Sequence, residues 1–358
     1  MPHRTTSVIA VAILSLFLFA YRSSAQEPSD RIVERARQGY VRDQLTLATI
    51  YRDGVGVTPD LSAAMYWFRR AANFGSPEAQ LQLGALLLQG SSAKHDPAGA
   101  LSWFRRSATS GYAPAMYDIG MVCLHLNLPR CEDGMAMISR SAELNYAPAE
   151  TALGNAFIDG QYGLTSDPSK GIQWLKRAAK QKFPNAQYSL GLVYLTGTHV
   201  QPDLHVSVLW LKRAADQGFI PAEDVLGRMY LLGKGVPVDL KVAEGLLSAA
   251  AQNGNVLSFV PLALLHQQQG LLGETYFDLL CAQSSPLLAQ KSFVRSTAEM
   301  LEAKLADQEK LSARMRADSW LKSHKDGHDP ICNGVHRGTC IAPIETESWA
   351  AGSIGSAH

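Results

Sequence analysis

Two serines of the chain stand three residues before a lysine, a spacing that lets a lysine amine activate a nucleophilic serine. The pairs are Ser91 with Lys94 and Ser319 with Lys322. So short a pattern arises by chance in most chains, and neither the Ser-Asp-Asn nor the Lys-Thr-Gly motif of β-lactam-recognising serine enzymes accompanies it. The patterns HExxH, GxSxG and GxxxxGK[ST] are also absent. We therefore predict no catalytic and no cofactor-binding residue.

The N-terminus has the pattern of a secretory signal peptide. After the basic start at Arg4, an apolar run of 13 residues extends from Val8 to Ala20. As a helix it would be about 20 Å long, too short for the ~30 Å hydrocarbon core of a bilayer. Small residues at Ser23 and Ala25 suit cleavage after Ala25. We predict a signal peptide over residues 1–25 and a periplasmic protein; an uncleaved anchor and a secreted protein are the alternatives.

The charges of the chain are nearly balanced, with 33 Lys and Arg against 32 Asp and Glu. Cleavage would remove Arg4 and Arg22 and no acid, leaving 31 minus 32, or −1. This balance gives no electrostatic reason to expect nucleic acid or an anionic membrane as partner. We expect no stable membrane insertion after leader cleavage. The adjacent Glu132 and Asp133 are interpreted as solvated charge in a loop.

The chain has five cysteines, four of them in pairs eight residues apart. In an exported protein disulfides are the first interpretation of such pairs. We predict Cys123–Cys131, which would link the two helices of one hairpin, and Cys332–Cys340, which would close a small loop. Cys281 is then a buried thiol or, alternatively, an intermolecular link.

The C-terminal tail carries ligand-type residues at every fourth position, which on a helix would form a stripe suited to Zn²⁺ or Cu²⁺. Pro330, Gly334 and Gly338 argue against a continuous helix, and a disulfide would consume both thiolates. We therefore predict a flexible tail over residues 324–358 and no metal site. The ligand-type residues are His324, His328, Cys332, His336 and Cys340.

A short phrase of a large apolar residue followed by a small one recurs along the middle of the chain. Successive copies are 36, 36, 34, 37 and 36 residues apart. Such a period indicates a repeat architecture. The copies are Leu47-Ala48, Leu83-Gly84, Ile119-Gly120, Leu153-Gly154, Leu190-Gly191 and Leu226-Gly227.

Other residue types recur in phase with this phrase. The last five copies have an alanine four positions before the phrase, and all six have an aromatic or apolar residue four positions after it. Most copies then have a turn glycine and an aspartate. We expect the phrase glycines (Gly84, Gly120, Gly154, Gly191 and Gly227) to belong to the repeat core. Four copies also carry a tryptophan followed by a small pair, and we expect these tryptophans to fill the space between hairpins. They are Trp67, Trp103, Trp174 and Trp210.

Each recurring residue has a physical role in a helix-turn-helix unit. Residues four apart lie on one face of a first helix, which we call helix A, and the glycine that follows ends it. The aspartate caps the N-terminus of a second helix, helix B. A single hairpin cannot bury its apolar face, so the units must stack.

The repeats predict an all-α fold: a right-handed α/α superhelical solenoid of about six 36-residue helix-turn-helix repeats with helical caps. The repeats would span residues 43–257, behind an N-terminal capping helix in 26–42. A degenerate repeat and C-terminal helices would follow in 258–323. Within that last segment we expect helices over 259–269, 274–281 and 292–321, the last one long and continuous.

This pattern resembles the Sel-one-like repeat, a relative of the tetratricopeptide repeat, over about 60% of the chain. The third copy departs from it, with Met137 at the tryptophan position and Gly134 at a small position, and the sixth copy has Leu246 for tryptophan. Some exported members of the family that this chain resembles have been associated with β-lactam recognition. The resemblance therefore leaves an enzyme as an alternative function.

Two basic residues stand two and three positions after each repeat tryptophan on helix B. They are Arg69-Arg70, Arg105-Arg106, Lys176-Arg177 and Lys212-Arg213. Cations near a helix C-terminus are favourable, so a solvated face is the simpler interpretation. The alternative is an acidic partner, either an acidic protein segment or an anionic polysaccharide.

We predict a non-catalytic protein–protein interaction scaffold or regulator of the bacterial cell envelope, which binds a protein partner on the concave solenoid surface. The resemblance implies a role in envelope assembly, exopolysaccharide production or sensor-kinase signalling. The alternatives are an exported cell-wall or β-lactam-recognising enzyme and a secreted host-interaction factor. The sequence does not indicate which residues bind the partner.

Overall fold

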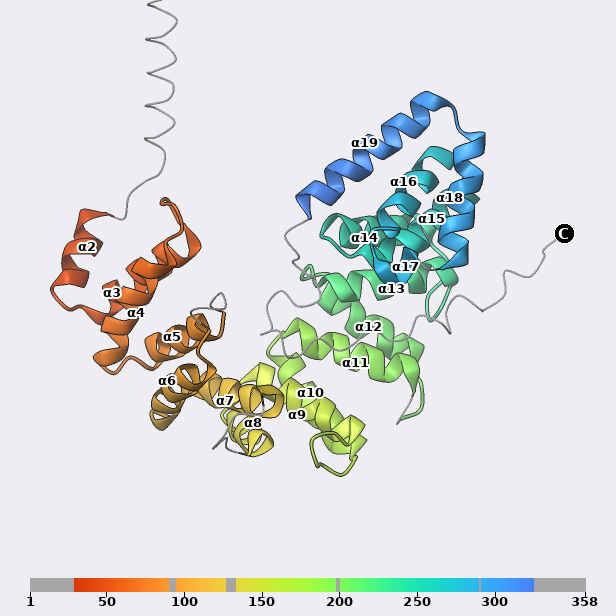
Figure 1. Cartoon of the computed structure of the whole chain (residues 1–358). Helices are drawn as coiled ribbons and strands as arrows, with labels where there is room; N and C mark the ends of the chain where they lie inside the picture. The colour runs from red at the N-terminus through yellow and green to blue at the C-terminus, as the bar shows by residue number, and fades with distance from the viewer. Residues whose placement is uncertain (1–28, 90–94, 127–132, 198–199, 290, 325–358) are drawn as a thin grey trace, which may run out of the picture. The chain divides into compact units, whose positions relative to one another are not determined.

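The computed structural model describes residues 29–89, 95–126, 133–197, 200–289 and 291–324 (Figure 1). These ranges are built from helices and contain no strand, as predicted. The chain divides into two compact units, Met1–Leu144 and Asn145–His358. No helix in the described ranges combines the length and the apolar character that crossing a bilayer requires.

The first unit opens with the short helix α2 (Asp30–Arg37), in the segment expected to form the N-terminal cap. Three helix-turn-helix hairpins follow, each with a helix A and a helix B. The hairpins are α3 (Val41–Asp53) with α4 (Leu61–Asn73), α5 (Pro77–Gln89) with α6 (Pro97–Thr109), and α7 (Ala113–Leu126) with α8 (Gly134–Glu143).

The second unit contains three more hairpins and a terminal group of helices. The hairpins are α9 (Ala147–Asp159) with α10 (Pro168–Lys180), α11 (Pro184–Thr196) with α12 (Leu204–Ala215), and α13 (Ile220–Leu232) with α14 (Leu240–Gln252). The terminal group is η1 (Val256–Ser258), α15 (Phe259–Gln268), α16 (Leu272–Ala282), α17 (Pro286–Ala289), α18 (Ser292–Lys304) and α19 (Asp307–Ser323).

Aspartate side chains begin the B helices, as the repeat pattern predicts. Each carboxylate accepts backbone N–H groups of its own first turn, for example Gly99 N–H to Asp96 at 2.8 Å. Asp133 does the same for α8, through Ala136 N–H at 3.1 Å; it is exposed, as expected of a solvated charge, and it also caps a helix. The aspartates that cap in this way are Asp60, Asp96, Asp133, Asp167, Asp203 and Asp239.

The phrase glycines let helix A approach helix B of the same hairpin. A Cβ placed on Gly191 would lie 2.6 Å from Leu211 Cγ, well inside van der Waals contact. Every phrase glycine meets the equivalent residue, the one directly after the tryptophan position. The pairs are Gly84 with Phe104, Gly120 with Ile138, Gly154 with Leu175, Gly191 with Leu211 and Gly227 with Leu247.

The tryptophans are less enclosed than the sequence suggested. Phe68, Phe104, Leu175 and Leu211 are 0% exposed, and each directly follows a tryptophan. The tryptophans themselves are half-buried. The central core position on helix B is therefore the residue after the tryptophan.

The expected long helix over 292–321 is two helices, α18 and α19. Leu305 between them is extended and buried in the terminal core. Glu309 then accepts the Ala306 N–H at 3.0 Å, which caps α19. The Trp320 ring closes the group by donating its N–H to the Ala251 carbonyl at 3.1 Å.

Candidate interaction surface

Each repeat tryptophan carries an arginine over its ring. The arginine stands three residues later, which places the two side chains on one face of helix B. These are cation–π contacts, in which the ring face attracts the guanidinium. The centroid distances are 5.5 Å for Arg70 over Trp67, 4.8 Å for Arg106 over Trp103, 4.4 Å for Arg177 over Trp174 and 4.5 Å for Arg213 over Trp210.

The four stacked arginines differ in their carboxylate partners. Arg177 Nε lies 3.1 Å from the buried Glu150 Oε1, so its charge is neutralised within its own hairpin. In the described part of the chain, no carboxylate pairs with Arg70, Arg106 or Arg213. These three arginines are therefore stacked on tryptophan rings, positively charged and available to a carboxylate of another molecule.

A second repeated position, on helix A, joins successive hairpins. A buried glutamine there donates its side-chain N–H to a carbonyl eight residues earlier, at the C-terminus of the preceding B helix. Each of these carbonyls also accepts the backbone N–H three residues further on, so the glutamine adds a second hydrogen bond at the helix end. The bonds are Gln44 to Ala36 at 3.0 Å, Gln80 to Ala72 at 3.1 Å and Gln187 to Ala179 at 3.4 Å.

Two repeats place glutamate at this buried position. Glu150 is compensated by Arg177 and by Gln181, which donates to it at 2.7 Å. Glu223 has one buried oxygen, Oε2, without a hydrogen-bond partner. Burial raises the pKa of both carboxyls.

Glu223 lacks partners because its own B helix differs. Ala249 stands where the fourth repeat has Arg177, and Asn253 stands where that repeat has Gln181. The shorter Asn253 side chain donates instead to the Ala249 carbonyl at 3.0 Å.

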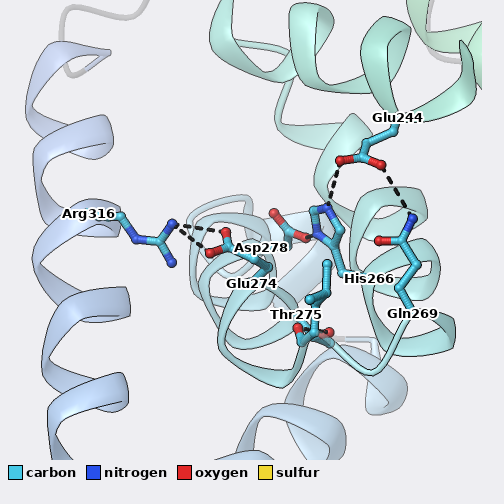
Figure 2. A network of polar contacts seen from close by, with 8 residues as sticks. Glu244, His266, Gln269, Glu274, Thr275, Asp278 and Arg316 are labelled. Carbon is cyan, nitrogen blue, oxygen red and sulfur yellow. Dashed lines mark hydrogen bonds and ion pairs between the residues drawn. The ribbon is translucent and has the colours of Figure 1, made fainter. Parts of the chain in front are cut away.

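A polar cluster lies among the terminal helices of the second unit (Figure 2). His266 on α15 makes a 2.6 Å hydrogen bond from Nδ1 to Asp278 Oδ2 on α16, and its Nε2 lies 3.8 Å from Glu244 on α14. Arg316 on α19 reaches Glu274 on α16 at 2.9 and 3.0 Å. The cluster thus ties four helices together.

The electrostatics of this cluster favour a proton between its members. Burial raises the pKa of Asp278 to about 6, although His266 acts in the opposite direction. The hydrogen bond to Asp278 raises the pKa of His266, against the effect of burial. Both directions stabilise the protonated cluster.

The cluster does not assemble a nucleophile beside its histidine. The Thr275 hydroxyl donates to the Leu271 carbonyl at 3.0 Å. Burial raises the pKa of the nearby Cys281 thiol to about 12, so the thiolate is not available at neutral pH. We interpret the cluster as a structural tie between helices.

The remaining candidate residues are placed as follows. Ser319 and Lys322 are exposed on α19, where no desolvation would activate them, and Ser91 and Lys94 lie outside the described residues. Cys281 is a buried thiol, as predicted. Across the described ranges, no three His, Cys, Asp or Glu side chains gather as metal ligands would.

Of the cysteines in the predicted disulfides, the described residues include only Cys123. Cys123 on α7 is disulfide-bonded. Cys131 lies outside the described residues, so its pairing with Cys123 stays a prediction. Cys332 and Cys340 also lie outside them, together with the tail residues that could bind a metal.

The recurring geometry of the hairpins agrees with comparison to known families. The Sel1 repeat model matches residues 44–75, 77–112, 147–183, 184–219 and 221–255. The chain belongs to the Sel1 repeat family. The third repeat, which the family model does not match, is nevertheless present as the hairpin of α7 and α8.

Solved structures support the same fold. A Sel1 repeat protein from Oxalobacter formigenes is 26% identical with a TM-score of 0.59, covering 78% of this chain and 84% of its own. The antigen c5321 of uropathogenic Escherichia coli, described as protective, is 22% identical with a TM-score of 0.65. That alignment covers 81% of this Sel1-repeat chain but only 63% of c5321. The search of curated proteins found no match.

Sequence reasoning missed two features of this surface. From the sequence, the tryptophans were interpreted as core residues and the arginines as solvated charges. Their constant three-residue spacing indicates instead that the two side chains contact each other. The buried glutamine position was also missed. Its signal was present, since Gln44, Gln80 and Gln187 occupy the same repeat position.

Proposed function

We propose that this protein is an exported, non-catalytic scaffold of the bacterial cell envelope that binds another protein. Sel1-repeat proteins generally mediate protein–protein interaction. Stacked hairpins suit this role because they present a long series of side chains on a rigid support.

One observation carries the proposal: most of the repeated residues are accounted for by packing and capping. Glycine permits helix contact, aspartate caps, and the residue after tryptophan fills the core. The exposed positions between them differ from repeat to repeat, as positions that bind a partner would. Tyr66, for example, corresponds to Ser102 and Leu209 in other repeats.

The location rests on the sequence of the N-terminus. The apolar run Val8–Ala20 and the small residues before Gln26 have the pattern of a cleaved leader. We place the mature protein in the periplasm. Envelope assembly, exopolysaccharide production and sensor-kinase regulation would each require a protein partner. We propose that shared feature and not one of the three pathways.

Crosslinking in the native cell tests the proposal. The protein would be expressed with its own leader and a tag, crosslinked in intact cells and purified from the solubilised envelope. We expect one envelope protein in near-stoichiometric amount, identified by mass spectrometry. Recovery of the folded, exported chain without a protein partner would contradict the proposal.

Labelling with a fluorescent penicillin separates the scaffold from the enzyme alternative. The expected result is no covalent label on the purified chain. A label that Ser319→Ala or Ser91→Ala removes would instead establish a serine enzyme.

A further inference from the structure

We propose that one face of the first unit binds an acidic segment of the partner protein, an inference that rests on the proposed scaffold function. The face comprises Tyr66, Trp67 and Arg70 on α4 and Trp103 and Arg106 on α6; we call it the α4–α6 surface. Its ligand is an extended peptide with several Asp or Glu side chains and at least one apolar side chain.

The two tryptophans of this surface are neighbours. Trp67 and Trp103 pack against the same buried cluster, which includes Phe68 and Leu83. Each holds an arginine over its ring, at 5.5 Å for Arg70 and 4.8 Å for Arg106. Two stacked guanidinium groups are therefore presented on adjacent hairpins of one compact unit.

The B helices of this unit are strongly basic. Helices α4, α6 and α8 carry five arginines, Arg69, Arg70, Arg105, Arg106 and Arg140, against one acid, Glu143. Their capping aspartates lie at the opposite ends of the helices and are bonded to backbone N–H groups. The B helices of this unit thus carry more basic than acidic side chains, and this excess attracts acidic groups.

The fourth repeat shows what such a stack binds. Arg177 lies 4.4 Å over Trp174, and its Nε is simultaneously 3.1 Å from the Glu150 carboxylate. An arginine stacked on tryptophan in this fold can therefore form an ion pair with a carboxylate through the edge of its guanidinium group. The ring fixes the guanidinium, so less side-chain entropy is lost on binding.

In the first unit the same carboxylate is missing. The positions equivalent to Glu150 are Gln44 and Gln80, whose amides point to backbone carbonyls. In the described residues no other acid pairs with Arg70 or Arg106. We infer that a partner supplies the carboxylates that Glu150 supplies internally in the fourth repeat.

Exposed aromatic side chains beside the arginines explain the apolar part of the ligand. Tyr66 is 54% exposed, lies edge-on to Trp67 at 5.0 Å and accepts a hydrogen bond from Arg70 at 3.4 Å. Phe74, which directly follows the C-terminus of α4, is 63% exposed. Aromatic and arginine side chains are the residues that dominate protein interfaces.

Fluorescence anisotropy of a labelled peptide tests the assignment with the mature chain. The probe is a 12-residue peptide of alternating Glu and Phe with Ser spacers, and its control replaces each Glu by Gln. We expect binding of the Glu peptide that weakens with salt, and at least about tenfold weaker binding of the Gln peptide.

Variants separate the stacked arginines from net charge. Arg70→Gln with Arg106→Gln should weaken the Glu peptide about tenfold or more. Arg140→Gln lies in the same unit without a tryptophan and should change binding less than about twofold. Circular dichroism would check that each variant is folded.

Three results would overturn the assignment. They are an equal loss of Glu-peptide affinity in Arg140→Gln and in the double variant, equal binding of the two peptides, or binding of alginate, an anionic polysaccharide, that exceeds peptide binding. Crosslinking the double variant in cells keeps the two proposals apart. A partner captured by wild type and equally by the variant rejects only the α4–α6 surface, whereas no partner with wild type rejects the scaffold.

Discussion

At the scale of single residues, Glu223 stands where three other repeats use glutamine to donate a hydrogen bond. A carboxylate cannot donate this bond, and the buried Glu223 Oε2 has no hydrogen-bond partner. In the protonated form it can replace the glutamine. The raised pKa of Glu223, caused by burial, agrees with this arrangement.

Replacing Glu223 by Gln should stabilise the protein. The pKa of Glu223 in the folded state lies above its unfolded value. The protonated carboxyl therefore contributes to stability below about pH 4.5, and this contribution is lost as pH rises through the folded pKa. Glu223→Gln should therefore raise stability by about 1 kcal/mol at pH 7.5 and have little effect at pH 4.5. Thermal unfolding at the two pH values measures this.

The reverse change in the neighbouring repeat is the matched test. Gln187→Glu should lower stability at pH 7.5 more than at pH 4.5. Equal effects at both pH values, in either variant, would show that the carboxyl proton has no part.

Glycine substitutions test the helix contacts. Gly191→Ala should destabilise by about 1–3 kcal/mol, because its Cβ would lie 2.6 Å from Leu211. Gly245→Ala is the control, since a Cβ there meets nothing within 4 Å. It should be stabilising by about 0.5–1 kcal/mol, as for any exposed helical glycine. Similar denaturant midpoints for the two variants would contradict the proposed contact.

The sequence predicted capping aspartates and close-packed glycines because each role restricts the residue type. It did not show that the tryptophans are only half-buried. Trp174 and Leu175 are both apolar and about 100° apart on the helix, so periodicity alone does not decide which faces the core. The structure assigns the centre of the core to Leu175, at 0% exposed.

At the scale of elements, the helices were largely predictable and one boundary was not. The break between α18 and α19 contains neither glycine nor proline, the usual signals of a helix end. It depends instead on burial of Leu305 and on the Glu309 cap. Both are tertiary or side-chain features that a search for helix breakers does not detect.

The polar cluster of Figure 2 gives the terminal helices a defined pH dependence. The hydrogen bond to Asp278 raises the pKa of His266 above its unfolded value near 6.5. This contribution to stability is present below that value and is lost as pH rises through the folded pKa. Asp278→Asn should therefore destabilise more at pH 6 than at pH 9.

Nuclear magnetic resonance titration of His266 checks the cause directly. Its pKa should fall in Asp278→Asn and change less in the control Glu244→Gln, whose carboxylate is more distant at 3.8 Å. An unchanged His266 pKa in Asp278→Asn would reject the proposed coupling.

At the scale of the whole molecule, a repeat period is easier to predict than a binding site. Six phrases at nearly constant spacing predicted six hairpins, including the third, which the family model does not match. The α4–α6 surface carries no such signal, because its tryptophans and arginines recur in other hairpins, where Arg177 has an internal carboxylate partner. The α4–α6 surface became visible only when the charge partners of each arginine could be compared.

Export makes a prediction for the whole chain. The protein isolated from the envelope should begin at Gln26, because we expect cleavage after Ala25. Intact mass spectrometry would show this. A mass that retains residues 1–25 would favour an anchored protein.

The central claim, that this Sel1-repeat protein works by binding another protein, is tested most directly by native mass spectrometry. The chain would be purified gently from its own cells, without crosslinker, under conditions in which its helical content is intact. The account predicts a complex whose mass exceeds that of the mature chain by one further polypeptide. Detection of the mature chain alone, folded and at native abundance, would contradict it.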